Sequence, residues 1–198
     1  MKKKDWFIKY SLEFIVIVLG ISVSFWINQV SINKQNNNER IKVLTSLQKE
    51  VKEIKDYCTE RKTTWQGDIA LINAFITPIN QQFNFETVTD LTKSKSRIQF
   101  NLIYYRVFEP PTERYHSIVN SGALKYINSE KITEMLSRIH STYSSYVQTT
   151  IEYEKKLKED LIIPIVSKKH PDIIIKKTDN TISMKKYCDI VYNSIQND

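Results

Sequence analysis

The chain has 198 residues, of which 29 are Lys or Arg and 22 are Asp or Glu, for a formal net charge of +7. Only three glycines occur, and this scarcity argues against β-sandwiches, nucleotide-binding loops and long flexible linkers. The positive charge suggests attraction to anionic lipid or to an acidic partner, although a solvated lysine-rich surface is the simpler interpretation.

A hydrophobic segment from Trp6 to Val30 follows a basic start that carries Lys2, Lys3 and Lys4. Its apolar core from Phe14 to Ile27 contains no charge, and the whole segment reaches the roughly 20 residues that a transmembrane helix needs. Aromatic residues that favour the headgroup level stand near both ends: Trp6, Tyr10 and Trp26. We therefore predict a transmembrane helix over residues 6–30, preceded by a short basic tail of residues 1–5.

The segment can be interpreted as an uncleaved signal anchor or as a cleavable signal peptide. A cleavage site needs small residues after the apolar core, and the first alanine of the chain is Ala70. Ser22 and Ser24 could imitate such a site, but the bulky Phe25 and Trp26 follow directly. The sequence therefore favours the signal anchor.

The distribution of basic residues predicts the orientation of the span. Lysines crowd its N-terminal side, whereas a neutral stretch, residues 29–33, follows it before a few scattered basic residues. The positive-inside rule then favours a cytoplasmic N-terminus. Residues 31–198 would form one extracytoplasmic domain of about 165 residues, large enough to bury its own core.

From Ile41 to Ile76, apolar residues recur every three or four positions, which predicts a long amphipathic helix that Pro78 ends. The stripe consists of Leu44, Leu47, Val51, Ile54, Cys58, Trp65, Ile69, Ile72 and Ile76. The run from Asn36 to Asn38 is either a joint or part of one helix that continues the span. Because further helices follow, packing in a bundle is a better interpretation than a coiled coil.

Cys58 and Cys188 are the two cysteines of the chain. In an oxidising compartment they could form a disulfide that ties the last segment to the first long helix. Such a bond would constrain the unfolded chain by about 4–5 kcal/mol on the entropy model. The alternative is two buried free thiols.

The sequence pattern of residues 81–108 does not predict one type of secondary structure clearly. Residues 81–95 are polar, with a short helix expected near Phe85 to Leu91. The residues from Arg97 to Phe108 are rich in aromatic and aliphatic side chains and could form a helix or a strand. Their helical surroundings favour a helix.

Pro110 and Pro111 end that element, and Pro111 can stand near the start of a helix from Thr112 to Asn120. Gly122 is a candidate left-handed cap after this helix. A second long helix is then expected, with Asn128 or Ser129 at its N-terminus.

The second long helix is predicted to end at Pro164. Its apolar stripe consists of Ile132, Met135, Leu136, Ile139, Tyr143, Tyr146, Val147, Ile151, Leu157 and Leu161. After a turn signal at Asp179-Asn180, a last helix is predicted from about Ser183 to Ile195. Its inner side consists of Met184, Tyr187, Cys188, Val191, Tyr192 and Ile195.

The stretch from Glu13 to Asn28 reads E-F-I-V-I-V-L-G-I-S-V-S-F-W-I-N. With a glutamate, a glycine seven residues on and an asparagine eight beyond that, it resembles the span of a large family of uncharacterised single-span membrane proteins of Bacteroidota. Trp26 stands where a glutamine is common in that family, and the usual tryptophan after the asparagine is missing. Residues 121–146, which begin S-G-A-L, loosely resemble the family's second block. The resemblance implies a single-span anchor with a helical outer domain, and it implies no activity.

One face of the predicted span carries four small or polar residues: Glu13, Gly20, Ser24 and Asn28. Gly20 and Ser24 form a small-xxx-small pair that lets a second helix approach closely. We interpret the face as a site of self-association or partner binding, with Glu13 as a buried polar contact. In one alternative Glu13 snorkels to the cytoplasmic surface and pairs with Lys9. A proton path through Glu13 is disfavoured because no second span supplies partners.

No catalytic residue, cofactor or metal site is predicted from the motifs. His116, His140 and His170 lack metalloprotease spacing, and no Cys-x-x-Cys occurs. Arg114 and His116, beside Glu109, resemble an active site only at first sight, and a capping or ion-pair role is favoured. No nucleophile motif with its supporting residues is present.

Tyr143, Tyr146 and Tyr153 lie among lysines in a helical pattern. Aromatic residues interleaved with basic ones can indicate nucleic-acid binding. In an outward-facing domain the stronger interpretation is a bundle core with hydroxyls at its rim, so no nucleic-acid partner is predicted.

These observations predict an all-α protein with one N-terminal transmembrane helix followed by an irregular antiparallel helical bundle. We expect a single-pass protein of a bacterial inner membrane, with a cytoplasmic N-terminus and a periplasmic domain. The favoured function is a non-enzymatic interaction or scaffold protein, an accessory subunit of an envelope complex that binds a protein partner or a second copy through the transmembrane helix. One alternative is a helical ligand-sensing module that acts through a partner, and a second is an enzyme with an unrecognised site.

Overall fold

The computed structural model describes residues 3–76, 84–175 and 182–196, and within these ranges the chain contains helices and no strand. The predicted all-α fold with one long apolar N-terminal helix is thereby confirmed.

The chain divides into two compact units that are each discontinuous in sequence. Unit 1 comprises Met1–Glu50 and Glu113–Glu134, and unit 2 comprises Val51–Thr112 and Met135–Asp198. The first helix contributes residues to both units, so neither unit corresponds to a single stretch of chain.

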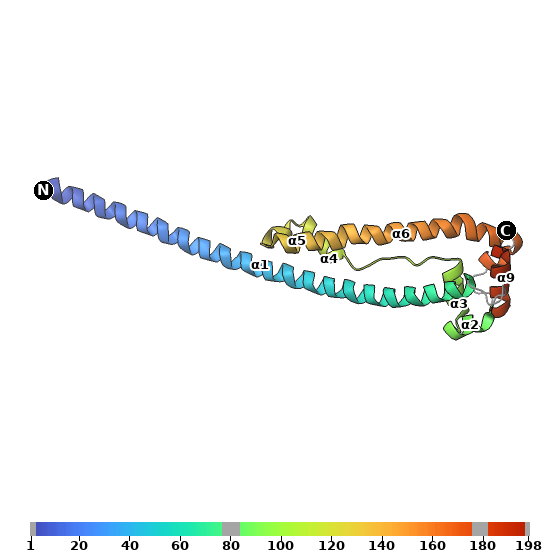
Figure 1. The fold of residues 1–198 in the computed structure, drawn as a ribbon. Helices are drawn as coiled ribbons and strands as arrows, with labels where there is room; N and C mark the ends of the chain where they lie inside the picture. The colour runs from blue at the N-terminus through green and yellow to red at the C-terminus, as the bar shows by residue number, and fades with distance from the viewer. Residues whose placement is uncertain (1–2, 77–83, 176–181, 197–198) are drawn as a thin grey trace. The chain divides into compact units, whose positions relative to one another are not determined.

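Helix α1 runs from Lys3 to Ile76 without interruption (Figure 1). The asparagine run at residues 36–38 therefore continues the helix and does not form a joint. The described part of the helix reaches Ile76, the last residue of the predicted apolar period, while Pro78, the expected stop, lies outside the described residues.

In unit 1, α4 (Glu113–Asn120) is followed by the short 3₁₀ helix η1 (Ala123–Tyr126) and by the start of α5 (Glu130–Ser137). Gly122, which separates the first two, has a φ of 69°. The left-handed conformation predicted at Gly122 is therefore confirmed, and it is one that a residue without Cβ adopts at little cost.

In unit 2, the short helices α2 (Phe85–Leu91) and α3 (Lys95–Leu102) each begin at a polar cap. The Asn84 side chain accepts the backbone N–H of Glu86 at 2.9 Å. The Ser94 hydroxyl oxygen accepts the backbone N–H of Arg97 at 3.3 Å. Both interactions satisfy amides that the first helical turn leaves without a partner.

The predicted helix from Arg97 to Phe108 is wrong in its second half, because α3 ends at Leu102 and residues 104–112 are not helical. Tertiary partners replace the missing helical hydrogen bonds. The carbonyl oxygens of Asn101 and Tyr104 both accept hydrogen bonds from the ammonium group of Lys158.

A nearly continuous helical stretch runs from residue 130 to residue 169. It consists of α5, the π-helical turn η2 (Arg138–Tyr143), α6 (Ser144–Leu157), a second π-helical turn η3 (Lys158–Ile162) and α7 (Ile163–Lys169). The predicted end at Pro164 is wrong, because this proline lies in the first turn of α7, directly after the wide turn η3. Proline lacks an N–H, and a wide turn relieves the clash that its ring would otherwise cause.

The non-helical segment after α3 runs back along α1 in unit 2. The Arg106 guanidinium pairs with Asp68, and the backbone N–H of Glu109 reaches Tyr57, which is eleven residues earlier on α1. Helix α6 then runs in the same direction as this part of α1 (Figure 1). The antiparallel neighbour of α1 in unit 2 is thus an extended segment, and it returns the chain between the two long helices.

The core of unit 2 is closed by α8 (Pro171–Ile175) and α9 (Met184–Gln196). It consists of Leu71, Phe75, Val88, Ile98, Ile103, Val166, Ile173, Tyr187, Cys188 and Val191. The predicted inner side of the last helix is confirmed for Tyr187, Cys188 and Val191, which are buried, whereas Ile195 is exposed. The turn expected at Asp179-Asn180 lies outside the described residues.

The predicted stripe on α1 is only partly correct. Leu47 and Ile54 are buried as expected, but three predicted members are exposed: Cys58, Ile69 and Ile76. Asp68 and Phe75 are buried next to Ile69 and Ile76, and Leu71 is buried next to the half-buried Ile72. The helix turns a charged residue inward because Asp68 pairs with Arg106 and Arg97, which an apolar pattern does not reveal.

Candidate interaction surfaces

Residues 8–32 of α1 form an apolar surface that the rest of the described chain does not cover. Phe14, Phe25 and Trp26 are 67%, 70% and 69% exposed, and none of the most apolar window of the helix is buried. Within the described ranges, α1 is the one helix that is long and apolar enough to cross a membrane.

The predicted packing face lies on this surface, and Gly20, Ser24 and Asn28 line a shallow groove along it. A Cβ placed on Gly20 would meet nothing within 4 Å, so the backbone is open to a close neighbour there. The Ser24 hydroxyl donates to the Gly20 carbonyl oxygen at 2.8 Å, so it is satisfied within its own helix. Glu13 is exposed, and the alternative ion pair with Lys9 is not formed between these two described residues.

A second surface is a mainly apolar groove of about 380 Å³ in unit 2. Its walls come from α1, from α6 and from the end of α3, and they include Trp65, Ile69, Ile72, Phe100, Tyr104, Val147, Thr150 and Ile151. Small-molecule sites typically have this character, a largely apolar lining with a few polar groups.

Charged side chains are also part of this lining, among them Asp68 and Arg106. The Arg106 guanidinium lies 2.5 Å from the Asp68 carboxylate, and Arg97 Nε lies 3.5 Å from it. The Asn101 amide donates to the Asp68 carbonyl oxygen at 2.7 Å. These interactions satisfy the buried aspartate within the chain, so its main contribution is to hold the groove in shape.

Several large side chains of α6 and of the helical turns next to it in sequence are exposed. Tyr143, Tyr146 and Tyr153 are 56%, 70% and 73% exposed. Their interpretation as bundle core is therefore wrong, because the helix turns Leu136 and Ile151 inward instead. Met135, Leu157 and Leu161 are exposed as well. Exposed apolar side chains that gather on one helix are typical of an interaction surface.

The structure does not bring the two cysteines together. Cys58 is exposed on α1, Cys188 is buried in the core of unit 2, and both are free thiols. Burial raises the pKa of the Cys188 thiol to about 12, which makes it an inert apolar group at neutral pH. Partial burial also raises the pKa of Cys58.

The residues that resembled an active site belong to different units. Glu109 belongs to unit 2, whereas Arg114 and His116 belong to unit 1, and Glu109 and His116 are exposed. Arg114 contributes its backbone N–H, which donates to the carboxylate of the fully buried Glu50 at 2.6 Å. The carboxylate that caps α4 thus comes from Glu50, which the sequence analysis did not single out.

The three histidines are also separate. His140 Nδ1 lies 2.8 Å from the carbonyl oxygen of Leu136 on its own helix, and His116 and His170 are exposed. Among the described residues, no three His, Cys, Asp or Glu side chains lie close enough together to hold a metal ion.

Sequence reasoning missed the buried polar residues Glu50, Asp68 and Lys158. Their positions in the sequence could have indicated this burial, because Glu50 and Asp68 lie on the buried side of α1 between apolar residues. A charged residue at such a position either breaks the stripe or has a buried partner.

Comparisons with models of protein families, with curated proteins and with solved structures found no match.

Proposed function

We propose that this protein is a single-pass membrane protein that acts by binding another protein and has no enzymatic activity of its own. In this proposal it is an accessory or scaffold subunit of an envelope complex in a bacterial inner membrane, with a cytoplasmic N-terminus and a periplasmic helical domain. The observation that carries the proposal is the uncovered apolar surface of α1 over residues 8–32.

This surface is unfavourable in water and favourable in a bilayer. Each large apolar side chain gains about 1.5–3 kcal/mol when it leaves water for an apolar medium. Residues 8–32 would cover roughly 37 Å along the helix axis at 1.5 Å per residue, enough to cross a hydrocarbon layer of roughly 30 Å with some tilt. The lysines before the segment support a cytoplasmic N-terminus.

A small-residue face on the span supports association with a second helix. In hydrocarbon there is no hydrophobic force between helices, so close packing and polar contacts drive their association. Gly20 leaves the backbone open, and Glu13 places a carboxyl group on the same face, where a partner would compensate for its poor solvation. The partner would be a membrane protein or a second copy of this chain.

The first test is purification of the tagged full-length protein from native membranes in mild detergent, with mass analysis of whatever is retained. Gly20→Ile should remove the retained partner or the homo-oligomer, because a bulky side chain blocks close approach. Ser22→Ile is the matched control, since it makes the same kind of change on the opposite side of the helix. Glu13→Gln should weaken the association less than Gly20→Ile.

A stoichiometric partner lost only with Gly20→Ile would support the accessory-subunit proposal. Equal retention with both variants would count against the packing face. A chain that is recovered from the soluble fraction after its apolar segment has been cleaved would be a processed secreted protein, and the anchoring itself would then be wrong.

The groove of unit 2 favours a second candidate function, a ligand-sensing module that signals through a partner. Thr150 lines the groove and Thr149 does not, and both side chains are exposed. Thr150→Trp should therefore fill the groove without disturbing the core, with Thr149→Trp as its control. Native mass spectrometry of the full-length protein would show a bound small molecule in the wild type and the control but not in Thr150→Trp.

A further inference from the structure

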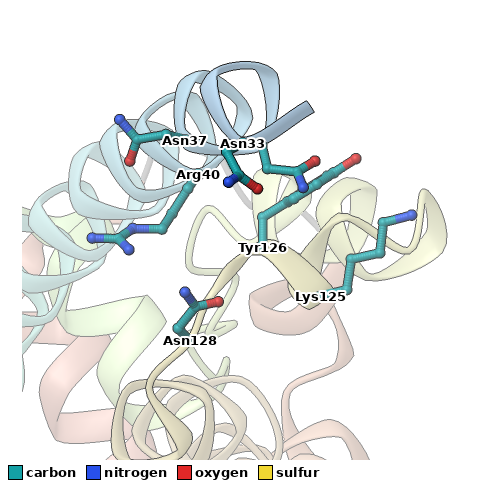
Figure 2. A pocket seen from close by; sticks show the side chains of 7 residues that line it. Asn33, Asn37, Arg40, Lys125, Tyr126 and Asn128 are labelled. Carbon is teal, nitrogen blue, oxygen red and sulfur yellow. The ribbon is translucent and has the colours of Figure 1, made fainter. Parts of the chain in front are cut away.

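Unit 1 contains a polar pocket of about 670 Å³ between α1 and the segment around η1. Its lining consists of Asn33, Asn36, Asn37, Arg40, Lys125, Tyr126 and Asn128 (Figure 2). The α1 members recur every three or four residues, so they share one face of the helix. No carboxylate is among the seven lining residues.

The pocket begins where the apolar segment of α1 ends. Val30 and Ile32 are the last exposed apolar residues of that segment, and Asn33 is the first lining residue. At 1.5 Å per residue, the α1 members extend to roughly 15 Å beyond Val30 along the helix. The polar headgroup layer adds about 5–8 Å on each side of the hydrocarbon, so the pocket begins at that depth and the long side chain of Arg40 can reach back to it.

The residues that line the pocket provide hydrogen-bond donors and positive charge. Neither Arg40 nor Lys125 forms an ion pair with any other residue that the structure describes, so both charges are available to a ligand. The nearest acidic residue in sequence, Glu39, is already 2.7 Å from Lys42. Three asparagines of α1 add amide N–H donors, and a guanidinium binds phosphate oxygens in a planar, bidentate manner.

The second wall of the pocket is held in place by the fold. Gly122 adopts the left-handed turn that begins η1, and the buried Ile127 follows η1 directly. The Ile127 backbone N–H donates to the Leu124 carbonyl oxygen at 2.9 Å. The Lys125 ammonium lies 5.2 Å from the ring centre of Tyr126, which is half-buried. In Figure 2, the side chains of Arg40 and Lys125 lie on opposite sides of Tyr126, and the Arg40 guanidinium points away from the Tyr126 ring.

We propose that this pocket binds the phosphate group of an anionic phospholipid headgroup in the leaflet at the C-terminal end of the span. The proposal rests on the membrane anchoring proposed above, but it does not depend on the orientation of the span. A free phosphate group has the same chemistry. The position of the pocket at the end of the apolar segment favours the lipid as its source.

The test uses the full-length protein in detergent micelles that contain equal amounts of phosphatidylglycerol and phosphatidylcholine. Native mass spectrometry gives the ratio of the two lipids that remain bound. The wild type should retain more phosphatidylglycerol than phosphatidylcholine. Because a basic residue near an anionic lipid surface contributes about fivefold in affinity, R40Q/K125Q should lower this preference by about tenfold or more.

The matched control is K62Q/K156Q, which removes the same charge from two exposed lysines outside the pocket. Its preference should stay within about twofold of the wild type if the effect is local. An equal loss in both double variants, or no preference in the wild type, would overturn the proposal. Displacement of phosphatidylglycerol by sodium phosphate at a similar concentration would assign the pocket to free phosphate and overturn the lipid assignment.

Flotation with vesicles of the same two lipids separates this inference from the proposed function. If all variants float and only the lipid preference fails, the anchoring stands and the headgroup site is wrong. If no variant floats, both the anchoring and the headgroup site are wrong. If all variants float and only R40Q/K125Q loses the lipid preference, both the anchoring and the headgroup site are supported.

Discussion

The ammonium group of Lys158 lies 2.9 Å from the carbonyl oxygen of Asn101, 57 residues earlier in the chain. It also donates to the carbonyl oxygen of Tyr104 at 2.7 Å and to the Glu154 carboxylate at 2.6 Å. A buried lysine thereby closes the carboxyl end of α3, where helical carbonyl groups lack N–H partners.

Lys158→Met should destabilise the protein by about 1–3 kcal/mol, because the methionine leaves two carbonyl groups at a buried site without donors. Lys156→Met, on the exposed side of the same helix, should change stability by less than about 0.5 kcal/mol. Thermal unfolding of the full-length protein in detergent, followed by circular dichroism, would measure both. Equal melting temperatures for the two variants would contradict this role of Lys158.

Glu50 should determine the stability of α4. Its buried carboxylate accepts the backbone N–H groups of Arg114 and Tyr115 at 2.6 and 3.1 Å. Glu50→Ala should therefore speed amide hydrogen exchange across Glu113–Asn120, with a loss of about 2–3 kcal/mol in local stability. Glu50→Gln keeps one acceptor oxygen and should have a smaller effect. Unchanged exchange in α4 with Glu50→Ala would show that the cap is dispensable.

Tyr187→Phe should be neutral or stabilising by up to about 1 kcal/mol. The Tyr187 hydroxyl is buried and has no hydrogen-bond partner among the described residues, so its removal loses no interaction and avoids a desolvation cost. Tyr57→Phe is the contrasting variant, because the Tyr57 hydroxyl accepts the Glu109 N–H at 2.8 Å. It should destabilise by about 1 kcal/mol. Thermal unfolding should show an unchanged or higher melting temperature for Tyr187→Phe and a lower one for Tyr57→Phe, relative to the wild type.

The two cysteines should differ in reactivity. A maleimide reagent at neutral pH should modify the exposed Cys58 in the native protein and reach the buried Cys188 only in denaturant. Mass analysis should show one adduct per chain before unfolding and two after it, and Cys58→Ser should show none before unfolding. Labelling that requires prior reduction would instead indicate the disulfide between them.

Alkaline pH should destabilise unit 2 through Cys188. The folded thiol has a pKa of about 12, above the ordinary value of 9.0, so the unfolded state loses this proton first as the pH rises. Stability from this group is full below pH 9 and declines by up to about 1.4 kcal/mol per pH unit as the pH rises toward 12. The slope of unfolding free energy against pH should be shallower in Cys188→Ala than in the wild type. Cys58→Ala, at the exposed cysteine, should keep a slope close to that of the wild type.

The helices that follow a regular apolar period were predictable from the sequence. The course of α1 as far as Ile76 and the inner side of α9 are of this kind, whereas the helix from Phe85 to Leu91 was expected within a polar stretch. Gly122 was predictable because few other residues adopt its conformation at low cost.

Elements that depend on distant polar partners were not predictable. The end of α3 depends on Lys158, and the inward side of α1 depends on the partners of Asp68. The polar pocket of unit 1 was missed for a related reason. Its lysine and arginine come from segments more than 80 residues apart, so no local motif contains both.

The two π-helical turns have a consequence for every residue that follows them. A turn that closes on the fifth residue instead of the fourth contains one residue more than an α-helical turn, so it changes the rotational phase of the downstream helix by about 100°. At η3 this extra residue allows both Lys158 and Val166 to face inward in unit 2. If the same residues closed as an α-helical turn instead, Val166 would rotate by about 100° relative to Lys158 and would no longer share its inward face. The number of residues in this turn therefore helps to determine which side chains of the following helix face the core.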